Sequence, residues 1–303
     1  MNVLSLFDGM SCGQQALERA GVKVDNYYAS EIDKYAITVT MANYPNTKQL
    51  GSVVDVKGSD LPKIDLLLGG SPCQSFSFAG KRKGMSTKCE TEILTLEHYL
   101  ELKEEGYEFE GQSYLFWEYM RLLNEVKPKY FLLENVMMGK KWQSILTKAI
   151  GVEPIVINSS LVSAQNRKRL YWTNIPNIEV PKGEFVHCSN IIPNAVGGSG
   201  NRGKFKNPDG TWFRQWTTRT DGLINCLTKS SGCRYVTLTD GTRRPLTIEE
   251  CEQFQGVPIG YTQTIGVTKK DRHDMLGNGW TIDVIKHFFS FIPELKNILV
   301  NQK

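Results

Sequence analysis

Reactive side chains follow two apolar runs of the kind that form buried strands. The run 64–68 is closed by two glycines and leads to Pro72 and Cys73, and the run 130–133 leads directly into Glu134. Ligands bind in open α/β sheets at the carboxyl ends of strands, which is where these side chains would lie. A cysteine held beside loop amides ionises more readily than a structural one, and a carboxylate can hold or exchange a proton. The pattern therefore predicts a nucleophile and an acid–base group at one edge of a sheet.

A pair of arginines lies in the segment 164–171, Ala-Gln-Asn-Arg-Lys-Arg-Leu-Tyr. Arg167 and Arg169 are two residues apart, so in an extended chain their side chains point to the same side. Each motif also has an ordinary structural explanation, because a lone cysteine usually packs in a core, a glutamate often caps a turn and Arg-x-Arg is often solvated. Cysteine, glutamate and paired arginines in this order together favour a catalytic site.

A glycine-containing loop at residues 7–13 joins a predicted first strand to a predicted first helix. Glu31, 18 residues beyond Gly13, is the kind of acid that holds ribose hydroxyls in doubly wound folds. The glycine spacing is not G-x-G-x-x-G and Asp8 would repel a pyrophosphate, so we expect a cationic ligand with an amine and a sulfonium. We expect Asp55 to accept a hydrogen bond from an adenine amino group. A glycine turn at such a point also occurs for structural reasons alone.

The segments that must position these residues alternate between strand and helix patterns. Strands are expected at 1–7, 27–30, 64–68, 130–133, 154–157 and 170–173, and helices at 13–20, 34–43 and 114–126. This alternation predicts an α/β fold, a doubly wound and mostly parallel sheet with right-handed crossovers. The α/β pattern returns at 247–254 and 280–291.

Two segments interrupt the alternation, the charged stretch 83–112 and a region poor in long apolar runs that begins near residue 176. We therefore expect a first domain at 1–178, a smaller inserted domain at 179–245 and a C-terminal segment at 246–303 that completes the first domain. Residues 181–245 hold ten Lys or Arg and four Asp or Glu, a net charge of +6. Because the whole chain carries only +4, the remainder carries −2. A basic insert predicts phosphate contacts with a nucleic acid.

Composition limits the class of protein. Of the 303 residues, 40% are hydrophobic and 22% charged, which excludes a disordered chain, a collagen and a coiled coil. The longest apolar runs are far shorter than the roughly 20 residues that span a bilayer, and the first residues do not resemble a signal peptide. The seven cysteines are scattered, with no C-x-x-C pair, so we expect no disulfide framework, no metal site and a reducing, cytoplasmic location.

Taken in order, these motifs resemble those of the cytosine-C5 DNA methyltransferases over nearly the whole chain. The motifs that carry the resemblance are Phe7–Gly13, Pro72-Cys73-Gln74, Glu134-Asn135-Val136, Gln165-x-Arg167-x-Arg169, the block from Arg244 to Pro258 and Gly277-Asn278-Gly279-Trp280. Residues 80–84 and 261–289 are also similar to the vertebrate de novo branch. The resemblance implies a Rossmann-like class I methyltransferase fold with an inserted target-recognition domain. It also implies S-adenosylmethionine as the cofactor and double-stranded DNA as the partner.

The resemblance implies three sets of site residues. The catalytic residues are Cys73, Glu134, Arg167 and Arg169. The cofactor-binding residues are Phe7, Asp8, Gly9, Ser11, Gly13, Glu31, Ile32, Asp55, Val56, Pro72, Asn278 and Trp280. The DNA-binding residues are Gln74, Ser77, Arg82, Arg214, Arg219, Lys229 and Arg234, with no base assigned to any of them.

The implied chemistry explains why these residue types are needed. Carbon-5 of cytosine is too weak a nucleophile to take a methyl group from a sulfonium unaided, so the Cys73 thiolate would first add to carbon-6. Glu134 would bind N3 and the exocyclic amine and share a proton with N3. Arg167 would stabilise the adduct and orient Glu134, with Arg169 supporting the same loop. The cytosine must leave the duplex to be reached, and the base that removes the carbon-5 proton is not identified.

Departures from the family pattern leave alternatives open. The insertion 83–112 either extends DNA or protein contacts or is a surface excursion, and the last block reads Gly-Asn-Gly-Trp in place of the commoner Gly-Asn-Ser-Val. The alternative functions are a tRNA-methylating enzyme of the same family, a branch without a substantial recognition domain, and a catalytically silent paralogue that binds nucleic acid. Retention of Cys73, Glu134 and Arg167 argues against the last. We expect a monomer in the cytoplasm of a bacterial or phage-infected cell, and the target sequence, biological role and oligomeric state stay open.

Overall fold

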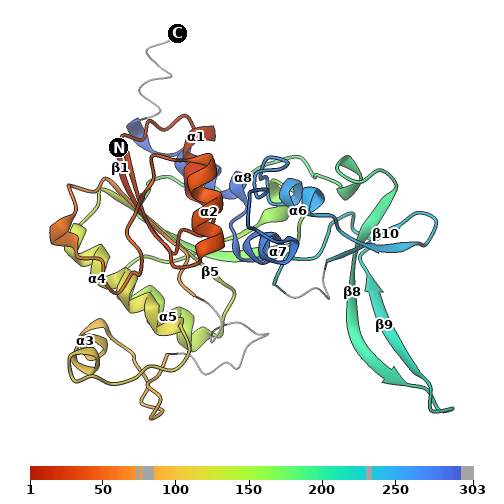
Figure 1. Cartoon of the computed structure of the whole chain (residues 1–303), viewed down its shortest axis with the longest axis horizontal. Coiled ribbons are helices and arrows are strands. Elements are labelled where there is room, and N and C mark those ends of the chain that lie inside the picture. Colours follow the sequence, from red (N-terminus) through yellow and green to blue (C-terminus); the bar gives the residue numbers. More distant parts are fainter. Residues whose placement is uncertain (73–75, 77–84, 230–233, 295–303) are drawn as a thin grey trace, which may run out of the picture.

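The computed structural model describes residues 1–72, 76, 85–229 and 234–294, except for the side chain of Arg202. Within these residues, seven strands form a larger sheet in the order β3-β2-β1-β4-β5-β7-β6 (Figure 1). The strands are β1 (Asn2–Leu6), β2 (Asn26–Ser30), β3 (Lys48–Gln49), β4 (Leu66–Gly69), β5 (Tyr130–Val136), β6 (Ile155–Asn158) and β7 (Lys168–Thr173). The first five strands in chain order are parallel, and β7 runs antiparallel to β5 and β6. The predicted mostly parallel α/β sheet is confirmed, and its strand order reverses between β1 and β4, where ligands bind in such folds.

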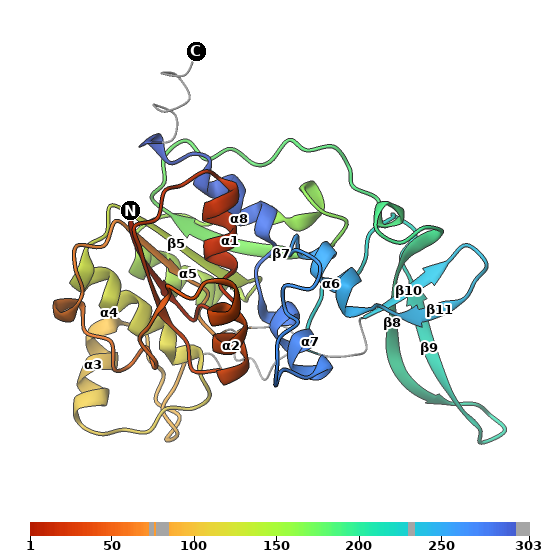
Figure 2. The same ribbon diagram turned by 45° about the horizontal axis from the view of Figure 1, so that its top comes forward.

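Helices cover both faces of this sheet (Figure 2). Those in the described residues are α1 (Cys12–Arg19), α2 (Lys34–Asn43), α3 (Leu96–Glu104), α4 (Phe116–Val126), α5 (Lys140–Ile150), α6 (Ile248–Phe254), α7 (Lys269–Asn278) and α8 (Ile282–Phe289). Successive side chains of a strand point to opposite faces. Accordingly Leu66 and Leu68 belong to the core shared with α1 and α8, and Leu67 belongs to the core shared with α4 and α5. The unbroken apolar run of β4 therefore reflects burial on both faces.

A second, antiparallel sheet lies on the right in Figure 1, beyond α6 and α7. Its strands are β8 (Ala195–Lys206), β9 (Trp212–Thr218), β10 (Tyr235–Leu238) and β11 (Arg243–Pro245), in the order β11-β10-β8-β9. β8 and β9 extend past the other two strands as a two-stranded ribbon. All four strands lie within the segment 179–245, which the sequence predicts as an inserted domain.

The insertion 83–112 contains α3, which is fastened to α4 by a buried charge. Glu118 of α4 is fully buried and accepts hydrogen bonds from the Tyr99 hydroxyl at 2.5 Å, the Lys103 ammonium at 2.6 Å and Arg121 Nε at 2.7 Å. Three donors compensate the desolvation of this carboxylate, which would otherwise destabilise the fold.

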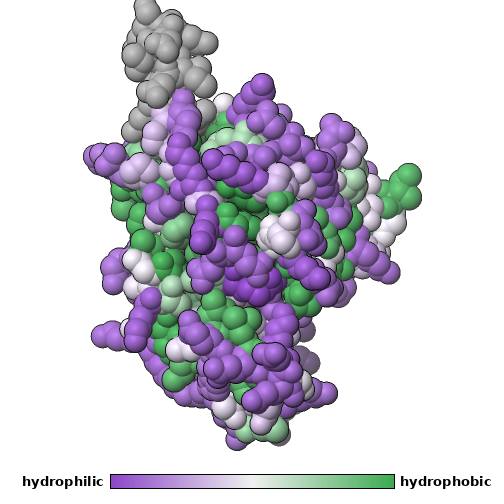
Figure 3. Space-filling view, turned by 90° about the vertical axis from the view of Figure 1, so that its left-hand side faces the viewer, coloured by the Kyte–Doolittle hydropathy of each residue, from purple (hydrophilic) through white to green (hydrophobic). Residues whose placement is uncertain are grey.

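The face over the left-hand side of Figure 1 is largely hydrophilic, with hydrophobic patches between the charged side chains (Figure 3).

Several elements of the larger sheet and its helices differ from the sequence-based expectations. β3, α5 and α7 lie in segments where no element is predicted, and β7 begins at Lys168, before its apolar run. α7 escapes the pattern because Met275 and Leu276 are its only large apolar residues, so no helical periodicity develops. Its N-terminus is instead defined by a capping box between Thr268 and Asp271.

Candidate active site

The loop 7–13 joins β1 to α1 at the carboxyl edge of the larger sheet. Phe7, Gly9 and Ser11 adopt left-handed backbone conformations, with φ of 58°, 59° and 58°. Such conformations are costly for Phe and Ser, and residues held in them cluster at binding sites. Nothing lies within 4 Å of the position that a Cβ would occupy at Gly9. The loop therefore leaves room for a ligand beside its backbone and the N-terminus of α1.

Gly13 lies where the start of α1 packs against the sheet. A Cβ at this position would lie 2.7 Å from the Tyr27 hydroxyl and 2.9 Å from a methyl group of Leu68. Only glycine allows the helix to approach this closely. The structure thus gives Gly13, expected among the cofactor contacts, a role in helix–sheet packing.

Asp8 is buried beneath the loop. One carboxylate oxygen accepts a hydrogen bond from the Tyr27 hydroxyl at 2.7 Å, and the other accepts from the Ser11 hydroxyl. Burial raises the pKa of Asp8 from 3.8 to about 6, against the lowering effect of these hydroxyls. The expected direct contact of Asp8 with a cationic ligand is not what this geometry provides. Because both oxygens are engaged inside the protein, Asp8 acts on the site by fixing the loop.

Glu31 follows β2 and faces the same loop. Its carboxylate accepts hydrogen bonds from the backbone N–H of Gly9 at 2.7 Å, of Ile32 at 2.7 Å and of Asp33 at 2.9 Å. Ile32 beside it leaves 68% of its surface exposed, which is unusual for an isoleucine. A fixed carboxylate and an exposed apolar side chain therefore lie together at the end of β2.

The remaining residues expected at the cofactor site occupy separate loops of the same region. Asp55 is exposed in the turn after β3, and Val56 is buried beside it, with its carbonyl accepting from Arg121 Nη2 at 2.9 Å. Pro72 is partly buried after β4, and Asn278 is exposed at the end of α7. No described contact joins these four residues to one another.

Glu134 lies in β5 near its carboxyl end and is held from two sides. Arg169 Nε lies 2.9 Å from Oε1 in an ion pair, and the Trp280 indole donates from Nε1 to Oε2 at 3.1 Å. A Cβ at Gly70 would lie 3.0 Å from Trp280 Nε1 and 3.4 Å from Glu134 Oε2, so glycine leaves the space that this arrangement needs. Trp280, expected in the cofactor pocket wall, thus reaches the carboxylate expected to bind the base.

Arg167 is buried and donates to main-chain carbonyls. Its guanidinium reaches the carbonyl oxygens of Leu227 and Gly279 at 2.8 Å each, and that of Gly277 at 3.4 Å. It therefore ties the segment before β10 to the block after α7.

The sequence-based expectation is that Arg167 orients Glu134, whereas in the described contacts Arg169 is the arginine that reaches this carboxylate. The reason is the register of β5 and β7. β5 ends at Val136, which pairs with Arg169, so Arg167 lies beyond the last paired residue of the strand.

Asn135 connects Glu134 to the loop that carries the predicted nucleophile. Its Nδ2 donates to the Ser71 carbonyl at 3.2 Å and to the Ser71 hydroxyl at 3.0 Å. Ser71 is buried, so the start of this loop is anchored next to Glu134. Cys73, Gln74, Ser77 and Arg82 lie outside the described residues.

A buried network of side-chain amides lies behind the site, and its members are not among the site residues expected from the sequence. Gln165 donates to Oε1 of Gln255 at 3.0 Å and accepts from the Leu227 N–H at 3.0 Å. The Thr281 hydroxyl also donates to Gln255 Oε1, at 2.9 Å. The available signals were the position of Gln165 two residues before Arg167 and that of Gln255 within the block from Arg244 to Pro258, whereas Thr281 lies outside the quoted motifs.

The expected DNA-binding residues that can be described lie in two places. Arg214 is exposed on the ribbon, directly opposite Lys204. Arg219 Nε donates to Asp221 Oδ1 at 2.9 Å, so its charge is already paired. Arg234 donates to the Lys229 carbonyl at 3.3 Å, and the Lys229 backbone lies against Gly277 near the end of α7. These four cations do not form one cluster.

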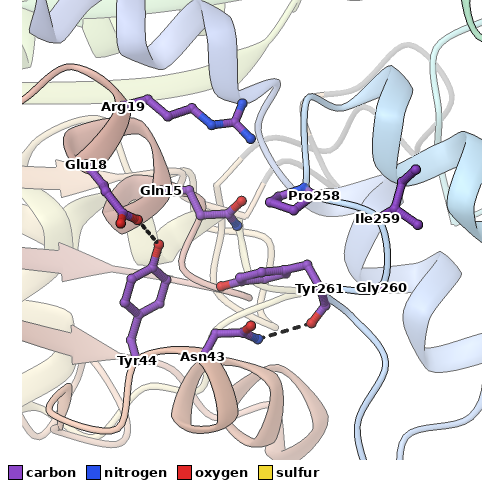
Figure 4. A pocket seen from close by; sticks show the side chains of 9 residues that line it. All are labelled: Gln15, Glu18, Arg19, Asn43, Tyr44, Pro258, Ile259, Gly260 and Tyr261. Carbon is purple, nitrogen blue, oxygen red and sulfur yellow. Dashed lines mark hydrogen bonds between the residues drawn. The ribbon is translucent and has the colours of Figure 1, made fainter.

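A cavity of about 420 Å³ lies along α1, away from this edge of the sheet (Figure 4). It is lined by Gln15, Glu18, Arg19, Asn43, Tyr44, Pro258, Ile259, Gly260 and Tyr261. The Tyr261 hydroxyl donates to the Met10 carbonyl at 2.8 Å, so this wall also braces the loop 7–13. None of the lining residues was expected in the site, and the cavity is separate from it.

The described residues form no helix long and apolar enough to cross a membrane. Within the same part of the chain, no group of three or more His, Cys, Asp or Glu side chains could hold a metal ion.

Curated relatives of the chain include methyltransferases of Bacillus phages. The orphan methyltransferase M.Rho11sI of Bacillus phage rho11s is 31% identical over 199 residues, which is 61% of this chain and 35% of that protein. The orphan methyltransferase M.SPRI of Bacillus phage SPR is 33% identical over 188 residues, 58% of this chain and 38% of that protein. Each match thus spans less than half of the relative's length.

A solved structure and a family model complete the comparison. The S. pombe Dnmt2 methyltransferase has a TM-score of 0.67 at 17% sequence identity, covering 98% of this chain and 99% of that one, which shows a shared fold. The family model for C-5 cytosine-specific DNA methylases matches residues 1–195, which include the loop 7–13, Glu134 and both arginines. The chain therefore belongs to the C-5 cytosine-specific DNA methylase family.

Proposed function

We propose that this protein transfers a methyl group from S-adenosylmethionine to carbon-5 of a cytosine flipped out of double-stranded DNA. The observation that carries the proposal is the geometry around β5. Glu134 is held by Arg169 and Trp280, while the next residue, Asn135, anchors Ser71, two residues before Cys73. A base-binding carboxylate and the start of a nucleophile loop thus share one edge of the sheet.

The residues at the ends of β1 and β2 fit S-adenosylmethionine. The Glu31 carboxylate is fixed by three backbone N–H groups, and because its two oxygens offer about four acceptor sites, one site remains for a ribose hydroxyl. The exposed Ile32 offers an apolar surface to an adenine ring, and the space at Gly9 admits the ligand. When bound, S-adenosylmethionine supplies the methyl group. Phe7, Ser11, Asp55, Val56, Pro72 and Asn278 complete the proposed cofactor contacts.

The proposed reaction follows from the chemistry of this chain's side chains. The Cys73 thiolate adds to carbon-6, which makes carbon-5 nucleophilic enough to take the methyl group. Glu134 shares a proton with N3 and accepts a hydrogen bond from the exocyclic amine, which stabilises the negative charge that develops on the ring. A base then removes the proton from carbon-5 and the thiolate leaves carbon-6, restoring the aromatic ring. Arg169 holds Glu134, and Arg167 contributes by holding the backbone behind it.

DNA contacts are proposed for the segment 179–245 as a target-recognition domain. Lys204 and Arg214 pair directly and share one face of the ribbon, as do their neighbours two residues along, Lys206 and Trp212. A two-stranded ribbon fits the major groove of DNA, and its cations suit the phosphates.

The insertion around α3 is acidic. Residues 85–112 hold eight Glu and two Lys, so electrostatic repulsion from the phosphates makes this insertion a poor DNA-binding surface. We further propose a cytoplasmic monomer, and the relatives from Bacillus phages support a bacterial or phage-infected cell as its source.

The test is methyl transfer from tritiated S-adenosylmethionine to duplex DNA and, in parallel, to tRNA. We expect label in DNA that is lost in Cys73→Ser and kept in Cys89→Ser, a matched change at an exposed cysteine. Label only in tRNA would favour the tRNA-methylating alternative. Label in neither polymer would overturn both enzymatic readings. Bisulfite sequencing of the labelled DNA would then define the target site.

The covalent step has a test of its own. A duplex containing 5-fluorocytosine at the target site keeps its carbon-5 substituent, so the thiolate cannot leave after methyl transfer. We expect a complex that survives denaturing electrophoresis with the wild type and is absent with Cys73→Ser. A stable complex with Cys73→Ser would refute the assignment of the nucleophile.

A further inference from the structure

Trp280 links the block after α7 to the carboxylate of β5. Its indole Nε1 donates to Glu134 Oε2 at 3.1 Å, and Gly70 leaves the space in which the two groups meet. The sequence motif of the last block implies only a place in the cofactor pocket wall for this residue. The contact with Glu134 joins residues 146 positions apart in the chain.

We infer that Trp280 is a positioning residue that fixes the Glu134 carboxylate for recognition of the cytosine ring. This inference rests on the proposed function. Arg169 holds Oε1 and Trp280 holds Oε2, so both the position and the rotation of the carboxylate plane are determined. The lone pairs that remain free can accept the exocyclic amine of cytosine.

An indole is suited to this role because its N–H is a donor only. It cannot rotate to become an acceptor, as a hydroxyl can, and it therefore keeps Oε2 as an acceptor. A Val at this position would offer no donor, and Glu134 would then be held by Arg169 alone. The presence of Trp in the Gly-Asn-Gly-Trp block thus has a consequence at the base pocket.

The backbone beside Trp280 is held rigidly enough for the indole to act as a fixed support. The carbonyl of Gly279 accepts hydrogen bonds from Arg167 at 2.8 Å and from Gln255 Nε2 at 3.1 Å. Both donors are buried. Hydrogen bonds from the buried network therefore hold Gly279, and the next residue, Trp280, hydrogen-bonds to Glu134.

The experiment measures tritium release from [5-³H]cytosine in a target duplex under single-turnover conditions, with saturating S-adenosylmethionine. Trp280→Phe keeps an aromatic ring and removes the N–H. The matched control is Trp117→Phe, which removes an indole from α4 whose buried Nε1 has no hydrogen-bond partner among the described residues. Because hydrogen bonds to charged groups are worth more than neutral ones, we expect Trp280→Phe to slow release about tenfold or more, and Trp117→Phe to leave the rate unchanged.

A double-mutant cycle with Glu134→Gln separates positioning from general structural damage. If Trp280 acts through Glu134, the Trp280→Phe effect shrinks to near unity in the Glu134→Gln background. Equal effects in both backgrounds, or a Trp280→Phe rate at or above that of the wild type, would overturn the inference. A wild-type protein that releases no tritium would instead overturn the proposed function, so the two failures are distinguishable. Binding of S-adenosylhomocysteine to each variant, measured by calorimetry, tests whether the cofactor pocket is intact.

Discussion

Arg167→Lys tests whether this residue is a structural clamp, as its contacts indicate, and not a direct partner of Glu134. The guanidinium of Arg167 donates to three carbonyls on two chain segments, with the two short bonds at 2.8 Å to Leu227 and Gly279. A lysine ammonium is a compact group on a flexible stem and cannot span both segments at once. At least one buried carbonyl therefore loses its donor.

The expected cost follows from that geometry. The Gly279 carbonyl keeps a second donor, Gln255 Nε2 at 3.1 Å, so the expected loss is that of one buried carbonyl left unpaired, which lowers the free energy of unfolding by about 1–3 kcal/mol. The measurement is urea unfolding of Arg167→Lys and the wild type, followed by fluorescence. Arg169→Lys is the matched variant, because it changes the same residue type two positions away. It keeps a cation near Glu134 but loses the guanidinium geometry, so its main effect should be on the rate of methyl transfer.

The refuting result is specific. If Arg167→Lys unfolds within about 0.5 kcal/mol of the wild type, the range of an ordinary surface substitution, the clamp does not stabilise the fold. If the same variant also loses methyl transfer more severely than Arg169→Lys, Arg167 acts in the chemistry itself. The assignment of the two arginines made from the register of β5 and β7 would then be wrong.

Three other outcomes follow from described contacts. Glu118→Ala leaves Lys103 and Arg121 without their buried carboxylate. It should therefore lower the free energy of unfolding, measured by urea unfolding, by about 3–5 kcal/mol. A change below about 1 kcal/mol would show that the insertion is not held through this residue. The folded-state pKa of Asp8, about 6, exceeds its ordinary 3.8, so ionisation opposes folding: the stability tied to its protonated form is complete below pH 3.8 and is lost as the pH rises through 6. Asp8→Asn should therefore gain about 2–3 kcal/mol relative to the wild type between about pH 4 and about pH 7, and equal pH dependence of the two proteins would contradict the assignment. Lys204→Ala and Arg214→Ala should each reduce the salt dependence of DNA binding, log Kd against log salt, by about one unit, while Lys148→Ala on α5 should not; an unchanged slope would remove the ribbon from the DNA interface.

Much of the fold could be predicted because local sequence patterns specify many of its strands and helices. Runs such as 64–68 and 130–133 are apolar throughout, which buried parallel strands require, and both became strands of the larger sheet. α7 could not be predicted, because its few apolar residues show no periodicity and its start depends on a capping box. The antiparallel direction of β7 was equally out of reach, since a short apolar run is compatible with either direction.

The candidate site divides in the same way. Asp8 stands in a glycine loop where sequence alone suggests an exposed ligand contact, and only packing shows that Tyr27 and Ser11 occupy its oxygens. Gln255 contacts Gln165 from 90 positions away, which no spacing rule indicates. Contacts of this kind depend on how distant segments pack, not on neighbouring residues.

The sequence by itself determined which residue types stand at the ends of the strands, because apolar runs and glycine turns specify local structure. From the order of those motifs it also pointed to the family. The tertiary structure decided which of these side chains meet. β7 runs antiparallel beside β5 and ends the pairing at Arg169, so that residue and not Arg167 reaches Glu134. The block after α7 then brings Trp280 to the same carboxylate, because long-range packing alone determines which donors a buried charge receives.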